Sequence, residues 1–155
     1  MLFRKSTTIL SGMLLLLFFT SSCITDPEKK ENQIIKNISA DEAHQLIEEN
    51  KGNTDFLIID IRTESEYNQG YIQDAINIDY YSPDFTDHLD DLDKNKTYLI
   101  YCRSGNRSDK TLNKMENLGF KEVYNLVGGI NTWMEKGYPL TEECPVCSVE
   151  KISKV

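Results

Sequence analysis

The sequence predicts an α/β fold in which helices cover both faces of a central parallel sheet. Short apolar runs bounded by polar residues, which are typical of buried strands, alternate with segments whose apolar residues recur at helical spacing. This alternation indicates parallel strands joined by crossover helices. The predicted strands span residues 56–61, 75–78, 97–101 and 122–126. The predicted helices span residues 40–50, 63–69, 82–92, 109–118 and 130–136.

A capping box starts the first predicted helix. Ser39 is the N-cap, and Glu42 stands three residues further on, where its side chain can reach back to the cap. The run 56–61 is apolar between polar residues, which fits a buried strand. The next elements are a short helix, a strand and an acidic, loosely helical segment, over residues 63–69, 75–78 and 82–92.

The second half of the predicted domain repeats the alternation. The strand 97–101 ends directly before Cys102, and the helix 109–118 has Leu112 and Met115 on one apolar face. A last strand and a last helix follow over residues 122–126 and 130–136.

Residues 102–108, Cys-Arg-Ser-Gly-Asn-Arg-Ser, have the character of an anion-binding loop. A cysteine between a strand end and a helix start lies where backbone N–H groups and the positive end of the helix dipole converge. This environment lowers the pKa of a thiol, and the thiolate is the nucleophile. Cys102 is therefore a candidate nucleophile, while the alternative is a small buried apolar residue at a strand end.

The N-terminus reads as a signal peptide over residues 1–22. Arg4 and Lys5 precede a mostly apolar stretch, residues 9–19, that is short of the about 20 residues a bilayer span needs. Small residues directly before Cys23 resemble a bacterial lipobox, which implies a lipid on Cys23. An ordinary secretory signal and an uncleaved anchor are the alternatives. Residues 23–33 would then form a flexible tether.

Charge limits the partners that we expect. The chain of 155 residues has 25 acidic and 17 basic side chains and a formal net charge of −8. An acidic domain argues against nucleic acid as a partner and against electrostatic adhesion to anionic lipid. The lipid on Cys23 would therefore be the membrane anchor, and the expected location is the bacterial cell envelope, on its extracytoplasmic side.

Two further cysteines lie in the C-terminal tail, residues 141–155. Cys144 and Cys147 enclose Pro145 and Val146 in a Cys-x-x-Cys pair. They can form an inert disulfide or remain spare thiols, act as a redox or sulfur-relay pair, or supply half of a zinc site. No second cysteine pair is present in the chain to complete such a zinc site, and His44 and His88 are isolated surface candidates. No metal or cofactor is expected.

Four motifs in order resemble the single-domain rhodanese family of sulfurtransferases. They are an apolar strand ending in Asp and Arg, a Glu-Tyr-x-x-Gly run, the cysteine loop and a closing Gly-Gly…Trp…Gly-Tyr-Pro run, at residues 56–62, 66–78, 102–108 and 126–139. The resemblance covers residues 34–140 and implies a rhodanese-like three-layer domain. Tyr71 replaces the family's usual His, and Asp74 replaces its usual Gly, which affects turn geometry more than chemistry.

The resemblance implies a ping-pong cycle on Cys102 without a cofactor. Cys102 takes the outer sulfur of a small donor such as thiosulfate and passes it from a persulfide to cyanide or a thiol. The spacing from Cys102 to Arg107 is Cys-x4-Arg, shorter than the Cys-x5-Arg of related cysteine phosphatases.

The remaining site residues receive supporting roles. The backbone of the anion-binding loop is expected to stabilise anionic sulfur. This loop comprises Arg103, Ser104, Gly105, Asn106, Arg107 and Ser108. Arg103 faces the mouth, and Arg107 braces the loop through Glu66 or Asp60. Ser108 is a candidate cap for the following helix. Asp60 and Arg62 are expected to be structural.

Two other function classes compete with a sulfurtransferase. One is an extracytoplasmic thiol-redox protein in which Cys102 works with Cys144 or Cys147. The other is a binding module that uses the rhodanese fold without turnover. The intact Cys102 favours the enzyme over the binding module, and the tail cysteines keep the redox alternative open.

Overall fold

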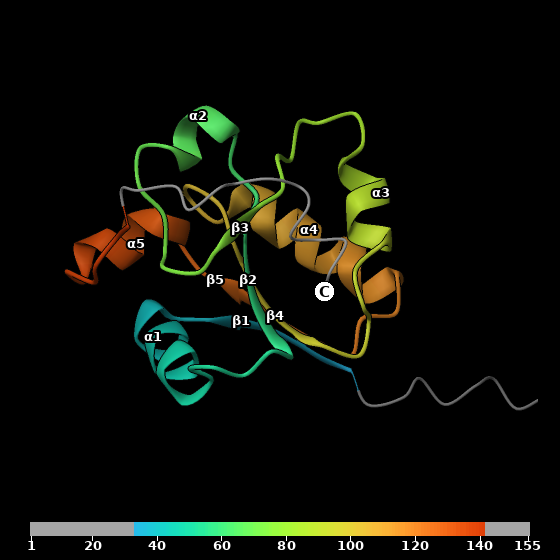
Figure 1. Cartoon of the computed structure of the whole chain (residues 1–155), viewed down its shortest axis with the longest axis horizontal. Coiled ribbons are helices and arrows are strands. Elements are labelled where there is room, and N and C mark those ends of the chain that lie inside the picture. The colour runs from blue at the N-terminus through green and yellow to red at the C-terminus, as the bar shows by residue number, and fades with distance from the viewer. Residues whose placement is uncertain (1–32, 142–155) are drawn as a thin grey trace, which may run out of the picture.

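Five parallel strands form the centre of the structure, a computed structural model that describes residues 33–141 (Figure 1). Their order across the sheet is β1-β5-β4-β2-β3. The strands are β1 Ile34–Ile38, β2 Phe56–Asp60, β3 Ile76–Asn77, β4 Thr97–Tyr101 and β5 Glu122–Leu126. The helices are α1 Ala40–Glu49, α2 Glu64–Tyr67, α3 Phe85–Asp90, α4 Asn106–Asn117 and α5 Gly129–Glu135.

Helices cover both faces of this sheet, which confirms the predicted three-layer α/β fold (Figure 1). One apolar core lies between the sheet and α1 and α5, and includes Ala43 and Trp133. The other lies between the sheet and α3 and α4, and includes Leu89 and Met115. The central strand β4 is apolar on both sides, because Leu99 and Tyr101 enter one core and Tyr98 and Ile100 enter the other.

The alternation of side chains in β4 decides which core each residue enters. Tyr101 packs into the core under α1 and α5, whereas Cys102 packs into the core under α3 and α4. Successive residues of a strand point to opposite faces, so Cys102 approaches the start of α4. Tyr101 points to the other side of the sheet, where its hydroxyl accepts a hydrogen bond from the N–H of Ile72 at 3.1 Å.

The strand β1 was absent from the sequence prediction. Lys36 and Asn37 are exposed and interrupt its apolar pattern. It is a strand because it pairs with β5, where Ile34 is opposite Glu122 and Ile38 is opposite Leu126. A residue-by-residue pattern does not report such long-range pairing.

The helix α4 begins at Asn106, three residues before the predicted start at Asp109. Gly105 is its N-cap and has a φ of 89°, a left-handed conformation that glycine adopts without steric cost. The second half of the cysteine loop is therefore the first turn of α4, and its N–H groups lack partners within the helix.

Two smaller features complete the fold. His44 is half-buried rather than free on the surface, because its ring stacks on Tyr138 at a centroid distance of 4.2 Å. Within residues 33–141, no helix has the length and apolar character that a membrane span requires.

Candidate active site

The thiol of Cys102 lies at the carboxyl end of β4, facing the first turn of α4. The residue is only 1% exposed. Its Sγ accepts a hydrogen bond from the N–H of Gly105 at 3.2 Å and one from the hydroxyl of Ser108 at 3.5 Å. The backbone N–H groups of Ser104, Arg107 and Ser108 also act on this sulfur. The loop therefore surrounds one sulfur atom with donors.

These donors determine the acidity of the thiol. Burial by itself raises the pKa of Cys102, but the hydrogen bonds from Ser108 and from the backbone N–H groups outweigh it. The net pKa lies below that of an ordinary cysteine. Hydrogen bonds to the charged form stabilise a thiolate, which is the form that attacks sulfur.

Ser108 does not cap α4, contrary to the sequence prediction. It lies inside the first turn, fully buried, and its hydroxyl contacts Cys102 Sγ and the carbonyl oxygen of Gly105. The cap position belongs to Gly105 because the helix starts one turn earlier than its apolar pattern indicates. Ser108 is thus a direct neighbour of the sulfur.

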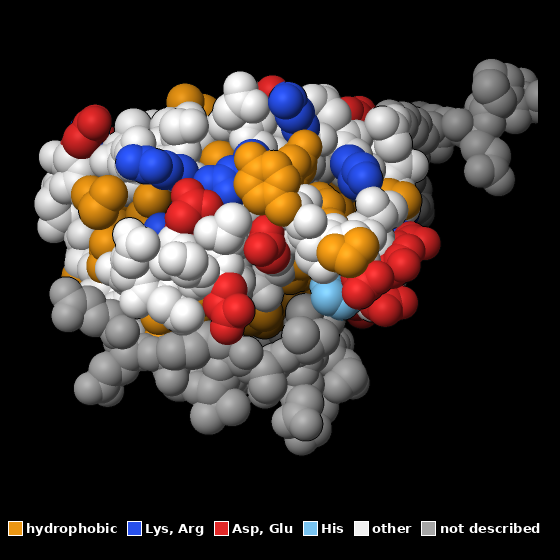
Figure 2. Space-filling view, turned by 90° about the horizontal axis from the view of Figure 1, so that it is seen from above, with side chains coloured by type: hydrophobic (Ala, Val, Ile, Leu, Met, Phe, Trp, Pro, Cys, Tyr) orange, Lys and Arg blue, Asp and Glu red, His pale blue; other side chains and the backbone are white. Residues whose placement is uncertain are grey.

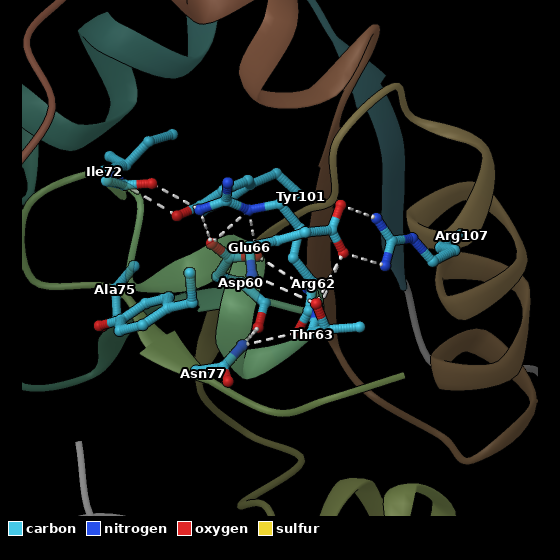
Figure 3. A network of polar contacts seen from close by, with 11 residues as sticks. Asp60, Arg62, Thr63, Glu66, Ile72, Ala75, Asn77, Tyr101 and Arg107 are labelled. Carbon is cyan, nitrogen blue, oxygen red and sulfur yellow. Dashed lines mark hydrogen bonds and ion pairs between the residues drawn. The ribbon is translucent and has the colours of Figure 1, made fainter. Parts of the chain in front are cut away.

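Arg107 is held by Glu66 in a bidentate ion pair (Figure 3). The same carboxylate accepts bonds from the N–H and the hydroxyl of Thr63 at 3.1 Å each. The pKa of Glu66 is lowered to about 2, chiefly by its bonds to Arg107. The guanidinium of Arg107 also lies over the exposed ring of Tyr81, 5.6 Å from its centroid.

Of the two partners that the sequence offered for Arg107, the structure selects Glu66. Asp60 is instead buried against Arg62, with Arg62 Nη2 2.6 Å from Asp60 Oδ2. Arg62 Nη2 also donates to the carbonyl oxygen of Gly70 at 2.7 Å. Through this bond the Asp60–Arg62 pair joins β2 to the chain segment after α2. Figure 3 shows Asp60 and Arg62 together within this polar network. Arg62 also borders the pocket described below.

Gly128 and Gly129 support the loop from the opposite side, a role that sequence reasoning missed. The N–H of Ile130 donates to the carbonyl oxygen of Cys102 at 2.9 Å. A Cβ on Gly129 would overlap that carbonyl oxygen and the main chain of Arg103. The glycine pair within the closing motif was the available signal, since only glycine permits such close backbone approach.

A pocket of about 290 Å³ lies beside the loop. Its lining combines charged, amide and apolar side chains: Arg62, Glu66, Gln69, Arg103, Ile130, Asn131, Met134 and Leu140, together with Gly70. Figure 2 views the molecule from the side on which α2 lies and shows basic, acidic and hydrophobic side chains close together on this face. Arg103 is the residue of the cysteine loop that borders this pocket. Its predicted place at the mouth of the sulfur site stays a prediction.

Arg103 differs from the other two arginines at the site. Arg62 and Arg107 each have a carboxylate partner. Within residues 33–141, no carboxylate pairs with Arg103, which is exposed. Its positive charge is available to an anion that enters the pocket.

Some predicted site residues lie outside the described range. These are Cys23, Cys144 and Cys147. In the part of the chain that the structure describes, no group of three or more His, Cys, Asp or Glu side chains is arranged to hold a metal ion.

Comparisons with known proteins agree with this geometry. The family model of the rhodanese-like domain matches residues 39–136. The chain belongs to the rhodanese-like domain family. At the level of this family, it is a rhodanese-type sulfurtransferase.

Individual relatives of this rhodanese-like chain carry matching names. A thiosulfate sulfurtransferase GlpE of Coxiella burnetii is 33% identical over 98 residues, which are 63% of this chain and 86% of the relative. A sulfurtransferase of Allochromatium vinosum is 36% identical over 86 residues, 56% of this chain and 78% of the relative.

Solved structures share the rhodanese-like fold. A rhodanese-related protein from Thermoplasma volcanium has a TM-score of 0.59 and 29% identity, and the match covers 70% of this chain and 99% of that one. A rhodanese-like domain protein from Staphylococcus aureus has a TM-score of 0.58 and 30% identity over 70% of this chain and 99% of its own.

The two departures from the rhodanese pattern have visible consequences. Asp74 has a φ of 64°, so an aspartate occupies a left-handed turn position where the family has glycine. Tyr71 is buried, and its ring stacks on Tyr67 at 4.1 Å. Neither side chain lines the pocket beside the loop.

Proposed function

We propose that the protein is an envelope sulfurtransferase that carries sulfane sulfur as a persulfide on Cys102. The observation that carries the proposal is the buried Cys102 Sγ inside a ring of N–H and hydroxyl donors, with its pKa lowered. The names of the relatives support thiosulfate as the type of donor.

The first half-reaction transfers one sulfur atom. The Cys102 thiolate attacks the outer sulfur of thiosulfate, the sulfur–sulfur bond of the donor breaks, and sulfite leaves with the bonding electron pair. Cys102 then carries an anionic persulfide. The backbone N–H groups of Ser104, Gly105, Arg107 and Ser108, which already act on the Cys102 sulfur, stabilise this charge.

The second half-reaction returns the free thiolate. Cyanide or a thiolate attacks the outer sulfur of the persulfide, and the Cys102 thiolate leaves. Because Arg103 has no carboxylate partner within the described residues and borders the pocket, it draws the anionic donor to the loop.

Substitution of the nucleophile tests this function. Cys102→Ser is nearly isosteric, so the melting temperature should remain close to that of the wild type while thiosulfate:cyanide transfer falls to background. Mass spectrometry after thiosulfate treatment should show one added sulfur on Cys102 in the wild type. Transfer at the wild-type rate by Cys102→Ser would remove Cys102 from its role and with it the proposed function.

A further inference from the structure

We propose that the pocket beside the cysteine loop binds the carboxylate of a small organic thiol, and that this thiol is the acceptor of the sulfur on Cys102. The inference rests on the proposed function and names the chemical class of its acceptor. It is argued from the residues that line the pocket and from the bonds that these residues make.

The pocket shares residues and backbone bonds with the cysteine loop. Arg103 of the loop lines it, as do Ile130 and Asn131 of α5. The N–H of Ile130 donates to the carbonyl oxygen of Cys102 at 2.9 Å, and the N–H of Asn131 donates to that of Arg103 at 3.2 Å. A molecule in the pocket therefore lies against residues that are bonded directly to the backbone of the nucleophile.

Arg62 brings a guanidinium with unused donors to this pocket. Its Nε and Nη2 donate to the carboxylate of Asp60, and Nη2 also donates to the carbonyl oxygen of Gly70. Within residues 33–141, Nη1 donates to no acceptor. The side chain is only 7% exposed, and the pocket is the open space that it borders. Both N–H groups of Nη1 are therefore left for an anion.

The charges at the pocket match one carboxylate. Glu66 is the acidic residue of its lining, and both oxygens of Glu66 accept bonds from Arg107. Arg62 is likewise paired with Asp60. These two ion pairs are neutral, so Arg103, which no carboxylate of the described residues neutralises, leaves one net positive charge. Guanidinium groups bind carboxylates through charge-assisted hydrogen bonds.

An apolar side distinguishes this pocket from a site for a small inorganic anion. Ile130, Met134 and Leu140 line it, and Met134 is 48% exposed. The volume of about 290 Å³ exceeds what thiosulfate or cyanide occupies. Ligand sites combine apolar walls with a few polar groups that fix orientation. The lining therefore fits an organic acid whose carbon skeleton contacts the apolar residues while its carboxylate meets Arg62 and Arg103.

The acceptor step balances without a further reactant. The thiolate of the bound acid attacks the outer sulfur of the Cys102 persulfide, the sulfur–sulfur bond breaks, and Cys102 leaves as a thiolate. The product is the persulfide of the organic acid. One sulfur atom has moved from one thiolate to another, so no external oxidant or reductant is consumed.

Two thiols that differ in the carboxylate test the subsite. The probes are 3-mercaptopropionate and its uncharged methyl ester. The parent is the full chain with Cys23→Ser, Cys144→Ser and Cys147→Ser, so that Cys102 is its one remaining cysteine. The parent is loaded with thiosulfate, freed of donor and mixed with each probe at equal thiolate concentration. We expect the Cys102 persulfide to be lost at least about tenfold faster with the acid than with the ester.

An isosteric change of charge locates the subsite. Gln69→Glu adds a carboxylate at an exposed residue of the lining, and Gln73→Glu makes the same change at an exposed residue outside the lining. The ratio of the acid rate to the ester rate should fall at least about fivefold in Gln69→Glu and keep the parent value in Gln73→Glu. The ratio cancels any effect on the persulfide itself. Arg62 is left unchanged because it also pairs with the buried Asp60.

Two results would overturn the subsite. One is an equal rate with the acid and the ester in the parent, because the carboxylate would then contribute nothing. The other is an equal ratio in Gln69→Glu and Gln73→Glu, because the carboxylate would then be recognised elsewhere than in this pocket.

Transfer to cyanide separates this inference from the proposed function. Cyanide carries no carboxylate and is tested with the same loaded protein. Sulfur that forms on Cys102 and passes to cyanide, while the acid and the ester react equally, removes the subsite and leaves the proposed function standing. A parent that gains no sulfur from thiosulfate and transfers none to cyanide overturns both.

Discussion

Arg107 and Glu66 form a bidentate ion pair although 41 positions separate them in the chain. Arg107 Nη1 lies 2.8 Å from Glu66 Oε2, and Nη2 lies 2.8 Å from Oε1. The pair links the first turn of α4, whose N–H groups face Cys102, to the short helix α2. The cysteine loop is therefore braced by a contact outside its own segment.

Loss of this pair should destabilise the protein at neutral pH. In Glu66→Gln the charge-assisted bonds to Arg107 are lost, and we expect the free energy of unfolding to fall by about 1–3 kcal/mol. The pKa of Glu66 is about 2 in the folded protein, below its ordinary value of 4.5. The stabilisation is therefore complete above about pH 5 and is lost as the pH falls toward 2.

Urea unfolding of wild type and Glu66→Gln across pH 2–7 measures this difference. The two stabilities should differ at pH 7 and converge near pH 2. Glu64→Gln is the control, because Glu64 is an exposed residue of the same helix. Parallel curves for wild type and Glu66→Gln over the whole range would contradict the assignment.

Ser108→Ala should raise the pKa of Cys102. The hydroxyl of Ser108 donates to Sγ and is the largest contribution that lowers this pKa. Its removal should shift the acid limb of the alkylation rate against pH upward, because the thiolate loses its strongest hydrogen-bond donor. Iodoacetamide alkylation measured by mass spectrometry gives this profile.

Ser104→Ala is the matched control for the thiol. Its side chain is removed, but the backbone N–H that acts on Cys102 remains. The profile of Ser104→Ala should coincide with that of the wild type. If Ser108→Ala also coincides with the wild type, the hydroxyl does not set the acidity of Cys102.

Gly129→Ala should disturb the cysteine loop. Gly129 has a φ of 61°, and a Cβ there would overlap the backbone of Cys102 and Arg103. Gly137 has a φ of 76° but open space around it. Gly137→Ala should cost about 1–2 kcal/mol for the left-handed backbone alone. Gly129→Ala should cost about 1–3 kcal/mol more, because it adds overpacking.

Thermal or urea unfolding compares the two glycine variants, and thiosulfate:cyanide transfer reports the loop. Gly129→Ala should lose both stability and transfer, and Gly137→Ala should lose a little stability only. The same stability and the same transfer rate in both variants would show that Gly129 has no special role beneath the loop.

Cys23→Ala tests the proposed lipid anchor. Without the thiol there is no site for a lipid, so we expect the protein in the soluble fraction or as an unprocessed precursor. Metabolic labelling with a fatty acid and membrane fractionation measure this outcome. Cys144→Ala serves as the cysteine control and should be labelled and retained like the wild type. A Cys23→Ala protein that is still processed and membrane-bound would refute the lipobox interpretation.

The strands and helices that the sequence predicted are those whose own residues carry the signal. The capping box of Ser39 and Glu42 is present in α1 as predicted. The apolar run at β2 and the strand before Cys102 are likewise in place. The strand β1 carried no such signal, since its Lys36 and Asn37 are exposed and only pairing with β5 orders it.

In the candidate site, too, some features could be predicted from neighbouring residues and others depend on tertiary contacts. The position of Cys102 between a strand and a helix, and the arginines that follow it, could be read from neighbouring residues. Which carboxylate holds Arg107 could not, because Glu66 and Asp60 are both near the carboxyl end of β2 along the chain. Asp60 forms an ion pair with Arg62, and Glu66 is the carboxylate that pairs with Arg107.

Local chemistry thus accounts for the α/β class, the order of the elements and the nucleophile, because periodicity, capping and turn residues act over a few positions. Tertiary structure decided the contacts among segments that meet at the carboxyl edge of the sheet. Because α4 starts at Asn106, one turn before its predicted start, the hydroxyl of Ser108 contacts the sulfur of Cys102. Packing between segments also places Gly129 next to the backbone of Cys102. These contacts depend on how separate strands and helices pack together, and no single segment carries that information.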